Sequence, residues 1–273
     1  MDVATIDLWA TRGTSPFHRA APWAKLLGAG LGVTATVVVN DAVALLAFYL
    51  LLVAAVVLTG LPTLRVLGVA AYPAIFALLF AVSRWNGSLA TPAVIVLKAL
   101  TAALAMVLLI TTTPYPEVFA ALRRATGPVV GDALFLTYRS LFLLLDLFGH
   151  LLTALRLRGG LRPRRYASNA RNLALGLGFL LIEAMELSQR LYAAMRVRGY
   201  AGHLAAPGRW RRRTPYDPLP VAVGGALLVV AVALQTGGAA IERYRGALLV
   251  LALLGLFTAL LLRGRVAPPT GEG

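Results

Sequence analysis

The chain contains no cysteine among its 273 residues. This absence excludes disulfide bonds, thiolate metal ligands and cysteine nucleophiles. Histidine is almost as scarce, because only His18, His150 and His203 are present and they lie far apart in the sequence. Three scattered histidines are poor material for a metal site built within one chain. The sequence also lacks a Gly-rich loop followed by Lys and Ser or Thr, the pattern that binds nucleotide phosphates. We therefore expect no catalytic residues, no metal ligands and no directly bound cofactor.

Charge is also scarce, since only 14% of the residues are charged and the mean hydropathy is +0.78. Typical soluble domains have more charged residues and a lower mean hydropathy. Several apolar runs have about the length that spans a bilayer core. Lys98, in the fourth run, lies near a helix end, and we interpret it as a snorkelling side chain. The pattern predicts an all-α fold, a polytopic membrane helical bundle, whose apolar runs are 23–39, 42–61, 64–82, 93–112, 221–234 and 246–262.

Positive charge is concentrated in one block of the chain. Sixteen of the 26 Lys and Arg residues fall between Pro114 and Pro215, against five acids. By the positive-inside rule this block is cytoplasmic, and the basic residues before the first run and after the last agree with it. These residues are Arg19, Lys25, Arg263 and Arg265. The net charge of +15 does not indicate nucleic acid binding, because the basic residues lie in blocks between apolar runs.

This topology places both termini inside the cell and the chain in the cytoplasmic membrane. It predicts a cytoplasmic N-terminal segment (1–22), a four-helix transmembrane region (23–112), a cytoplasmic helical domain (113–215) and a C-terminal transmembrane hairpin with its tail (216–273). Two long helices are expected within the cytoplasmic block, at about 129–158 and 168–198, because apolar residues recur there at three- and four-residue steps.

Both of these helices end in the same pattern, Ala-x-Arg-x-Arg-Gly, at 154–159 and 194–199. Gly159 and Gly199 are suited to the left-handed position after a helix, and Arg in the last turn favours the negative end of the helix dipole. Residues two apart point about 200° apart around a helix, so one cap cannot use both arginines equally. The free arginine of each pair suits docking onto a carboxylate of another protein. Sequence physics alone supports a simple cap and a docking tip equally.

The chain resembles a known family at these and other motifs. The pattern at 194–200, with Tyr200 after the glycine, is similar to the signature of the transmembrane T component of energy-coupling factor importers. Further motifs resemble the cobalt and nickel branch, the CbiQ type, at 15–19, 22–26, 112–116, 121–124 and 136–142. The resemblance covers about residues 15–202. The chain departs from the family in three ways. Leu157 and Val197 stand where the family usually has Ala, and Ala21 stands where an acid is common, so any salt bridge there is lost. The final hairpin adds an apolar run beyond the usual end.

The resemblance implies a non-catalytic T subunit. Two cytoplasmic ABC-type ATPase subunits, which bind ATP and Mg²⁺, would hold the two helix tips. Arg158 and Arg198 would be the principal contacts, supported by Arg156 and Arg196, with Gly159 and Gly199 ending the helices. Motion of the tips would shift an integral-membrane substrate-capture subunit, and the branch implies Co²⁺ or Ni²⁺ as the substrate.

Other readings stay open at this stage. One is the T subunit of an importer for a vitamin. Another is a membrane enzyme acting on a lipid, which the scattered acids disfavour because they form no Asp-rich cluster for Mg²⁺. A third is an assembly protein that binds anionic lipid through the basic blocks at 162–165 and 211–213. Under each of these readings we expect the protein to contact membrane lipid, and under none of them do we expect it to bind nucleic acid.

Overall fold

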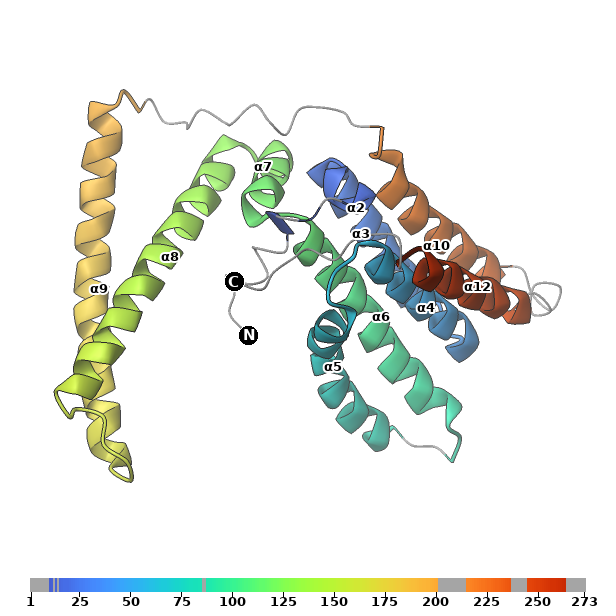
Figure 1. The fold of residues 1–273 in the computed structure, drawn as a ribbon, viewed down its shortest axis with the longest axis horizontal. Coiled ribbons are helices and arrows are strands. Elements are labelled where there is room, and N and C mark those ends of the chain that lie inside the picture. Colours follow the sequence, from blue (N-terminus) through green and yellow to red (C-terminus); the bar gives the residue numbers. More distant parts are fainter. Residues whose placement is uncertain are drawn as a thin grey trace. The chain divides into compact units, whose positions relative to one another are not determined.

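The structure is a computed structural model, and it describes residues 10, 11, 13, 15–84, 87–200, 215–236 and 245–263. In this part of the chain all regular secondary structure is helical. The chain forms two compact units: one comprises residues 1–118 and 208–273, the other residues 119–207. The helices, labelled in Figure 1, are α2 (Pro16–Arg19), α3 (Pro22–Val38), α4 (Ala42–Leu58), α5 (Thr63–Ser83), α6 (Ala90–Thr112), α7 (Tyr115–Thr126), α8 (Pro128–Leu157), α9 (Tyr166–Val197), α10 (Pro218–Thr236) and α12 (Arg245–Arg263).

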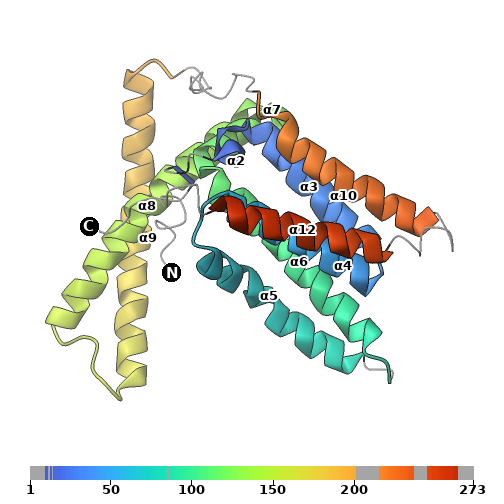
Figure 2. The ribbon, with the colours of Figure 1, turned by 45° about the vertical axis from the view of Figure 1, so that its right-hand side comes forward.

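The predicted all-α bundle is confirmed in the first unit, which we call the bundle. Helix α4 is apolar on every face and packs against both α6 and α12, while α3 packs against α6 and α10 (Figure 2). Proline at the first position starts α3, and the Asp41 side chain accepts a hydrogen bond from the Val43 amide at the start of α4. The core lies where these helices meet, around Phe48, Leu45 and Leu227.

Each apolar run of the sequence forms one helix. Helix α10 begins at Pro218, so it recruits the prolines that precede the run at 221–234 and reaches 19 residues. Among the described residues, four helical segments are long and apolar enough to cross a bilayer: α5, α6, residues 129–157 of α8, and α10. Helices α3 and α4, with 17 residues each, and residues 246–262 of α12 are shorter.

Helix α8 meets the length and composition for a span although the sequence analysis assigns it to the cytoplasm. Polar residues distinguish it from α5 and α6, because Asp132, Arg139 and Asp146 recur along it at seven-residue steps. The placement of 113–215 on the cytoplasmic side stays a prediction.

Two lysines of the bundle bind carbonyl oxygens at helix ends. Lys98 donates to the Val37 carbonyl (2.9 Å) and to the Asn40 side chain (2.8 Å), at the last turn of α3, which agrees with a side chain that reaches a helix end. Lys25 differs from the expectation of a charge that flanks the first span. Lys25 lies inside α3 and is only 3% exposed, and its amine donates to carbonyl oxygens within the bundle.

Helices α3 and α10 approach until their backbones touch. A Cβ atom added at Gly28 would overlap the Pro220 carbonyl, and one added at Gly224 would overlap the Gly28 carbonyl. Glycine permits this approach because it has no side chain to hold the helices apart. The C-terminal part of the chain is therefore packed closely against the first helix of the bundle.

The second unit, which we call the coupling unit, contains α8, α9 and most of α7. Phe119 of α7 stacks edge to face on Phe135 and Tyr138 of α8, with ring centroids 6.2 and 5.8 Å apart. Arg123 forms an ion pair with the buried Asp132 (3.2 Å) and fills the space beside Gly131. Aromatic contacts and one ion pair thus hold α7 against the start of α8.

Helices α8 and α9 form a long hairpin whose two arms cross (Figures 1 and 2). A Cβ atom at Gly176 of α9 would come within 2.8 Å of Leu151 of α8, so this glycine permits the closest approach of the two arms. Glu186 and Arg190, one turn apart on α9, form an ion pair with 2.7 Å between their oxygen and nitrogen atoms. The observed bounds agree with the predicted 129–158 and 168–198 within two residues.

We predict that Gly28→Ala and Gly224→Ala each destabilise the bundle by about 1–3 kcal/mol, because the added methyl group collides with backbone atoms that cannot rotate away. The measurement is the midpoint of unfolding in mixed micelles titrated with a denaturing detergent.

Gly30→Ala and Gly225→Ala are matched controls, since a Cβ atom at either position meets nothing within 4 Å. They should leave the midpoint unchanged or raise it slightly, because alanine favours a helix over glycine. Equal midpoints for all four variants would contradict the close packing of α3 on α10.

Candidate coupling site

The end of α8 is closed by its own backbone. Arg158, the residue after the last helical one, has φ −80° and ψ 3°, and Gly159 has φ +67°. The Gly159 amide donates to the Arg156 carbonyl (3.0 Å), and the Gly160 amide donates to the Leu155 carbonyl (2.8 Å). This pair of bonds is the Schellman motif, which satisfies the last carbonyl groups of a helix and needs a left-handed residue.

The end of α9 has the same geometry. Arg198 has φ −83° and ψ 10°, and Gly199 has φ +80°. The Gly199 amide donates to the Arg196 carbonyl and the Tyr200 amide to the Met195 carbonyl, both at 3.0 Å. The two copies of the sequence pattern therefore fold into the same helix end, and the prediction that each glycine takes the left-handed position is confirmed.

The side chains of the four tip arginines take no part in this closure. Arg156, Arg158, Arg196 and Arg198 are all exposed, and none forms a side-chain hydrogen bond or an ion pair with the part of the chain that the structure describes. Arg123 and Arg190 of the same unit differ, since Arg123 pairs with Asp132 and Arg190 with Glu186. Because the backbone alone closes both ends, the guanidinium groups are available to another molecule.

An exposed apolar side chain lies between the two arginines at each tip. Leu157 is 84% exposed and Val197 is 90% exposed, which makes them the most exposed large apolar residues that the structure describes in the coupling unit. These are the positions at which the sequence departs from the alanine of the family it resembles. Each tip thus presents two cations with an apolar side chain between them.

The two tips lie at opposite ends of the hairpin. Arg158 is followed by a short turn, after which α9 starts, so the first tip lies beside the beginning of α9 (Figure 1). Helix α9 has 32 residues and at 1.5 Å per residue is about 48 Å long. The second tip is therefore separated from the first by about the length of one long helix, which leaves room for a globular protein at each.

The turn after the first tip is held by asparagine side chains that sequence reasoning missed. Asn169 accepts from the Arg162 amide (2.9 Å) and donates to the Arg162 carbonyl (2.7 Å). Asn172 donates to the Gly160 carbonyl (2.7 Å), and the Arg162 side chain donates to the Gly159 carbonyl (3.1 Å). Asparagine near a helix start commonly binds backbone groups, which is the signal that could have identified these two residues.

The basic blocks have different outcomes. Arg162, Arg164 and Arg165 are exposed in this turn, and their contact with lipid headgroups stays a prediction. The second basic block, at 211–213, lies outside the described residues.

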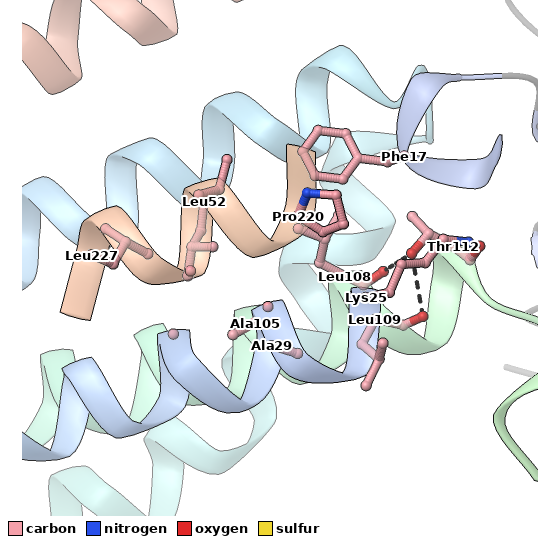
Figure 3. A pocket seen from close by; sticks show the side chains of 14 residues that line it. Phe17, Lys25, Ala29, Leu52, Ala105, Leu108, Leu109, Thr112, Pro220 and Leu227 are labelled. Atoms are coloured by element: carbon pink, nitrogen blue, oxygen red, sulfur yellow. Dashed lines mark hydrogen bonds between the residues drawn. The ribbon is translucent and has the colours of Figure 1, made fainter. Parts of the chain in front are cut away.

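Within the described residues, no group of three or more His, Asp or Glu side chains could hold a metal ion. A cavity of about 470 Å³, its open mouth included, lies between α3, α4, α6 and α10 in the bundle (Figure 3). Its walls are apolar apart from Thr112 and from Lys25, which already binds the Thr112 carbonyl. No acidic residue is among those that line the cavity.

We predict that Gly159→Ala and Gly199→Ala loosen the two helix ends, because a Cβ atom in the left-handed region costs about 1 kcal/mol. Amide hydrogen exchange over the last turn of α8 or α9 should become roughly fivefold faster in the corresponding variant.

Gly178→Ala, in the interior of α9, is the control. A Cβ atom meets nothing within 4 Å at either Gly178 or Gly199, and only Gly199 has a positive φ. An equal response of the two variants would show that the left-handed conformation does not hold the tip.

Comparison with known proteins agrees with the resemblance found in the sequence. The profile of one family, described as CbiQ, cobalt transport protein, matches residues 13–207. The match includes both helix tips and ends before α10, so α10 and α12 lie outside it. No curated protein matches the chain. Since the profile covers well over half of the chain and the structure supplies several apolar helices of membrane-spanning length, the chain is a membrane component of cobalt transport and belongs to the CbiQ family.

Proposed function

We propose that the protein is the T subunit of an energy-coupling factor importer, which transmits motion from two cytoplasmic ABC-type ATPases to an integral-membrane substrate-capture subunit. The observation that carries this proposal is the pair of identical helix ends whose arginine side chains have no partner within the described chain. A helix cap alone would need the glycine and the backbone, and it would not need two free guanidinium groups at each end.

The chemistry of the tips indicates what they would bind. Guanidinium groups favour carboxylates, which they can bind through two parallel hydrogen bonds. The same geometry at both tips suits two equivalent acidic pockets, one on each ATPase subunit. We propose Arg158 and Arg198 as the principal contacts, because they lie beyond the last helical residue, while Arg156 and Arg196 lie within the last turn and support them.

The proposed cycle assigns no chemistry to this chain. ATP and Mg²⁺ bind to the ATPase subunits, whose closing moves the two long helices α8 and α9. Because α8 and α9 cross and are in contact at Gly176, a movement of one helix is transmitted to the other. The description of the family supports cobalt as the substrate, with nickel as the related alternative and a vitamin as the more distant one. Both termini and the coupling unit are placed in the cytoplasm, on the evidence of the basic residues.

We predict that the double variant Arg158→Glu, Arg198→Glu abolishes co-purification with the ATPase subunits, because a carboxylate then faces an acidic pocket at each of the two tips and repulsion replaces attraction. The protein should still insert in the membrane, since both side chains are exposed. The measurement is the amount of ATPase retained by the tagged subunit, together with Co²⁺ uptake by cells that carry all subunits.

The control is Arg171→Glu, Arg190→Glu, which makes the same change of charge on exposed positions of α9 away from its end. It should retain both the ATPases and uptake. If the tip variant also retains them, the docking role is wrong. The corresponding double variant at Arg156 and Arg196 should have a smaller effect, and a larger one would reverse the assignment of principal and supporting contacts.

A further inference from the structure

The chain connects the bundle to the coupling unit twice, and both connections are tied to the first turn of α3. The chain leaves the bundle after α6, whose last helical residue is Thr112, and it returns at α10, which Asp217 precedes. Lys25 donates to the Thr112 carbonyl at 2.8 Å, and the Ala21 amide donates to the Asp217 carboxylate at 2.8 Å. Ala21 and Lys25 are four residues apart, which is one helical turn.

Lys25 is an unusual residue for this position. Lysine is rarely buried without an acidic partner. Lys25 is 3% exposed and forms no ion pair with any residue that the structure describes, although the charge of Glu117 in α7 acts on it. Its amine binds two backbone carbonyls, of Thr112 and of His18 (3.1 Å), each at the end of a helix. The last carbonyls of a helix lack partners in that helix and carry partial negative charge, so they favour a cation. Figure 3 shows Lys25 beside Thr112 at the end of the cavity.

At the end of α6 that Lys25 holds, the threonine hydroxyl groups are bonded within the helix. The hydroxyl groups of Thr111 and Thr112 donate back to the carbonyls of Val107 and Leu108, at 2.8 and 2.7 Å. Thr113 is buried and extended, with φ −132° and ψ 116°, as the residue before a proline must be. Only Thr113 and Pro114 separate α6 from α7, so a rotation of α7 acts directly on the end of α6.

Asp217 holds the other connection in a complementary way. Asp217 is 7% exposed. Its carboxylate accepts a hydrogen bond from the Ala21 amide at the start of α3, where the helix dipole favours negative charge. Asp217 lies outside the residues that the family profile matches. Ala21 lacks the acid that is common there in the family, and an acid from a distant part of the chain meets its backbone.

We propose that the first turn of α3 is the anchor against which the coupling unit moves, with Lys25 and Asp217 as its positioning residues. Lys25 fixes the chain where it leaves the bundle, and Asp217 fixes it where it returns. With both points held, motion of α8 and α9 is transmitted to the bundle and is not absorbed by local unwinding at the end of α6 or the start of α10. This inference rests on the coupling function proposed above.

The first test is Lys25→Met, which keeps the length of the side chain and removes its charge, in membranes that contain the complete importer. Co²⁺ uptake per ATP hydrolysed, for equal amounts of assembled complex, should fall about fivefold or more, since hydrogen bonds to a charged group are among the strong ones. The ATPases should still co-purify, because the tips are unchanged. Lys98→Met is the matched control, because Lys98 also binds the carbonyl of a helix end but lies away from both connections. In this variant Co²⁺ uptake per ATP hydrolysed should stay at the wild-type value.

Asp217→Ala should lower the same ratio, and Asp217→Asn should restore most of it, because an amide oxygen can still accept from the Ala21 amide. A ratio within twofold of wild type for both Lys25→Met and Asp217→Ala would overturn the anchor, while leaving the docking role intact if the ATPases co-purify.

A second experiment does not depend on the stability of these variants. The natural chain has no cysteine, so Ala21→Cys and Asp217→Cys can be joined to each other by a short bis-thiol linker. Asp217→Cys removes the carboxylate and should by itself lower Co²⁺ uptake per ATP hydrolysed, as Asp217→Ala does. If the anchor stays closed throughout the cycle, linking the two cysteines should restore that ratio toward the wild-type value. A loss of uptake that cleavage of the linker reverses would show that the two segments must separate, and would overturn the proposal.

Discussion

Every helix ends in amide or carbonyl groups that the helix itself cannot satisfy, and in a membrane protein water is often absent where they lie. This constraint is met in three ways in this chain. At the ends of α8 and α9 a left-handed glycine closes the backbone on itself. At the end of α6 a buried lysine binds the last carbonyl, and at the start of α3 a carboxylate from far along the chain binds the amide. The choice between these solutions determines which charges are used inside the molecule and which remain free.

The difference between the two kinds of helix end corresponds to a difference in purpose. A Schellman closure consumes no side chain, so the arginines at the two tips keep their full capacity for an acidic partner. A side-chain closure consumes the charge and joins two segments that are distant in sequence. The coupling unit therefore presents cations at its helix ends, whereas in the bundle Lys25 and Asp217 are buried near the points where the chain passes from one unit to the other.

Helices α10 and α12 lie beyond the residues shared with the family, yet they are integral to the bundle. Gly28 and Gly224 allow the backbones of α3 and α10 to touch, and α12 covers α4. In a bilayer such contacts depend on close packing more than on the hydrophobic effect, because the lipid is as apolar as the side chains. Helix α10 thus supports the helix whose first turn contains Lys25 and binds Asp217.

Much of this protein follows from the sequence alone. Hydropathy predicts the six apolar helices in their order along the chain, because a bilayer requires long apolar runs and permits few other structures. The repeated Ala-x-Arg-x-Arg-Gly pattern predicts both helix ends, since glycine and arginine act there through local backbone geometry. What the sequence could not provide is any contact between distant segments. It suggested that Lys25 is a flanking charge and that the acid missing at Ala21 leaves a gap, because neither Thr112 nor Asp217 is near them in sequence. Only the packing of α3 between α6 and α10 brings these groups together, and that packing depends on side-chain shape across the bundle, for which a single sequence carries no periodic signal.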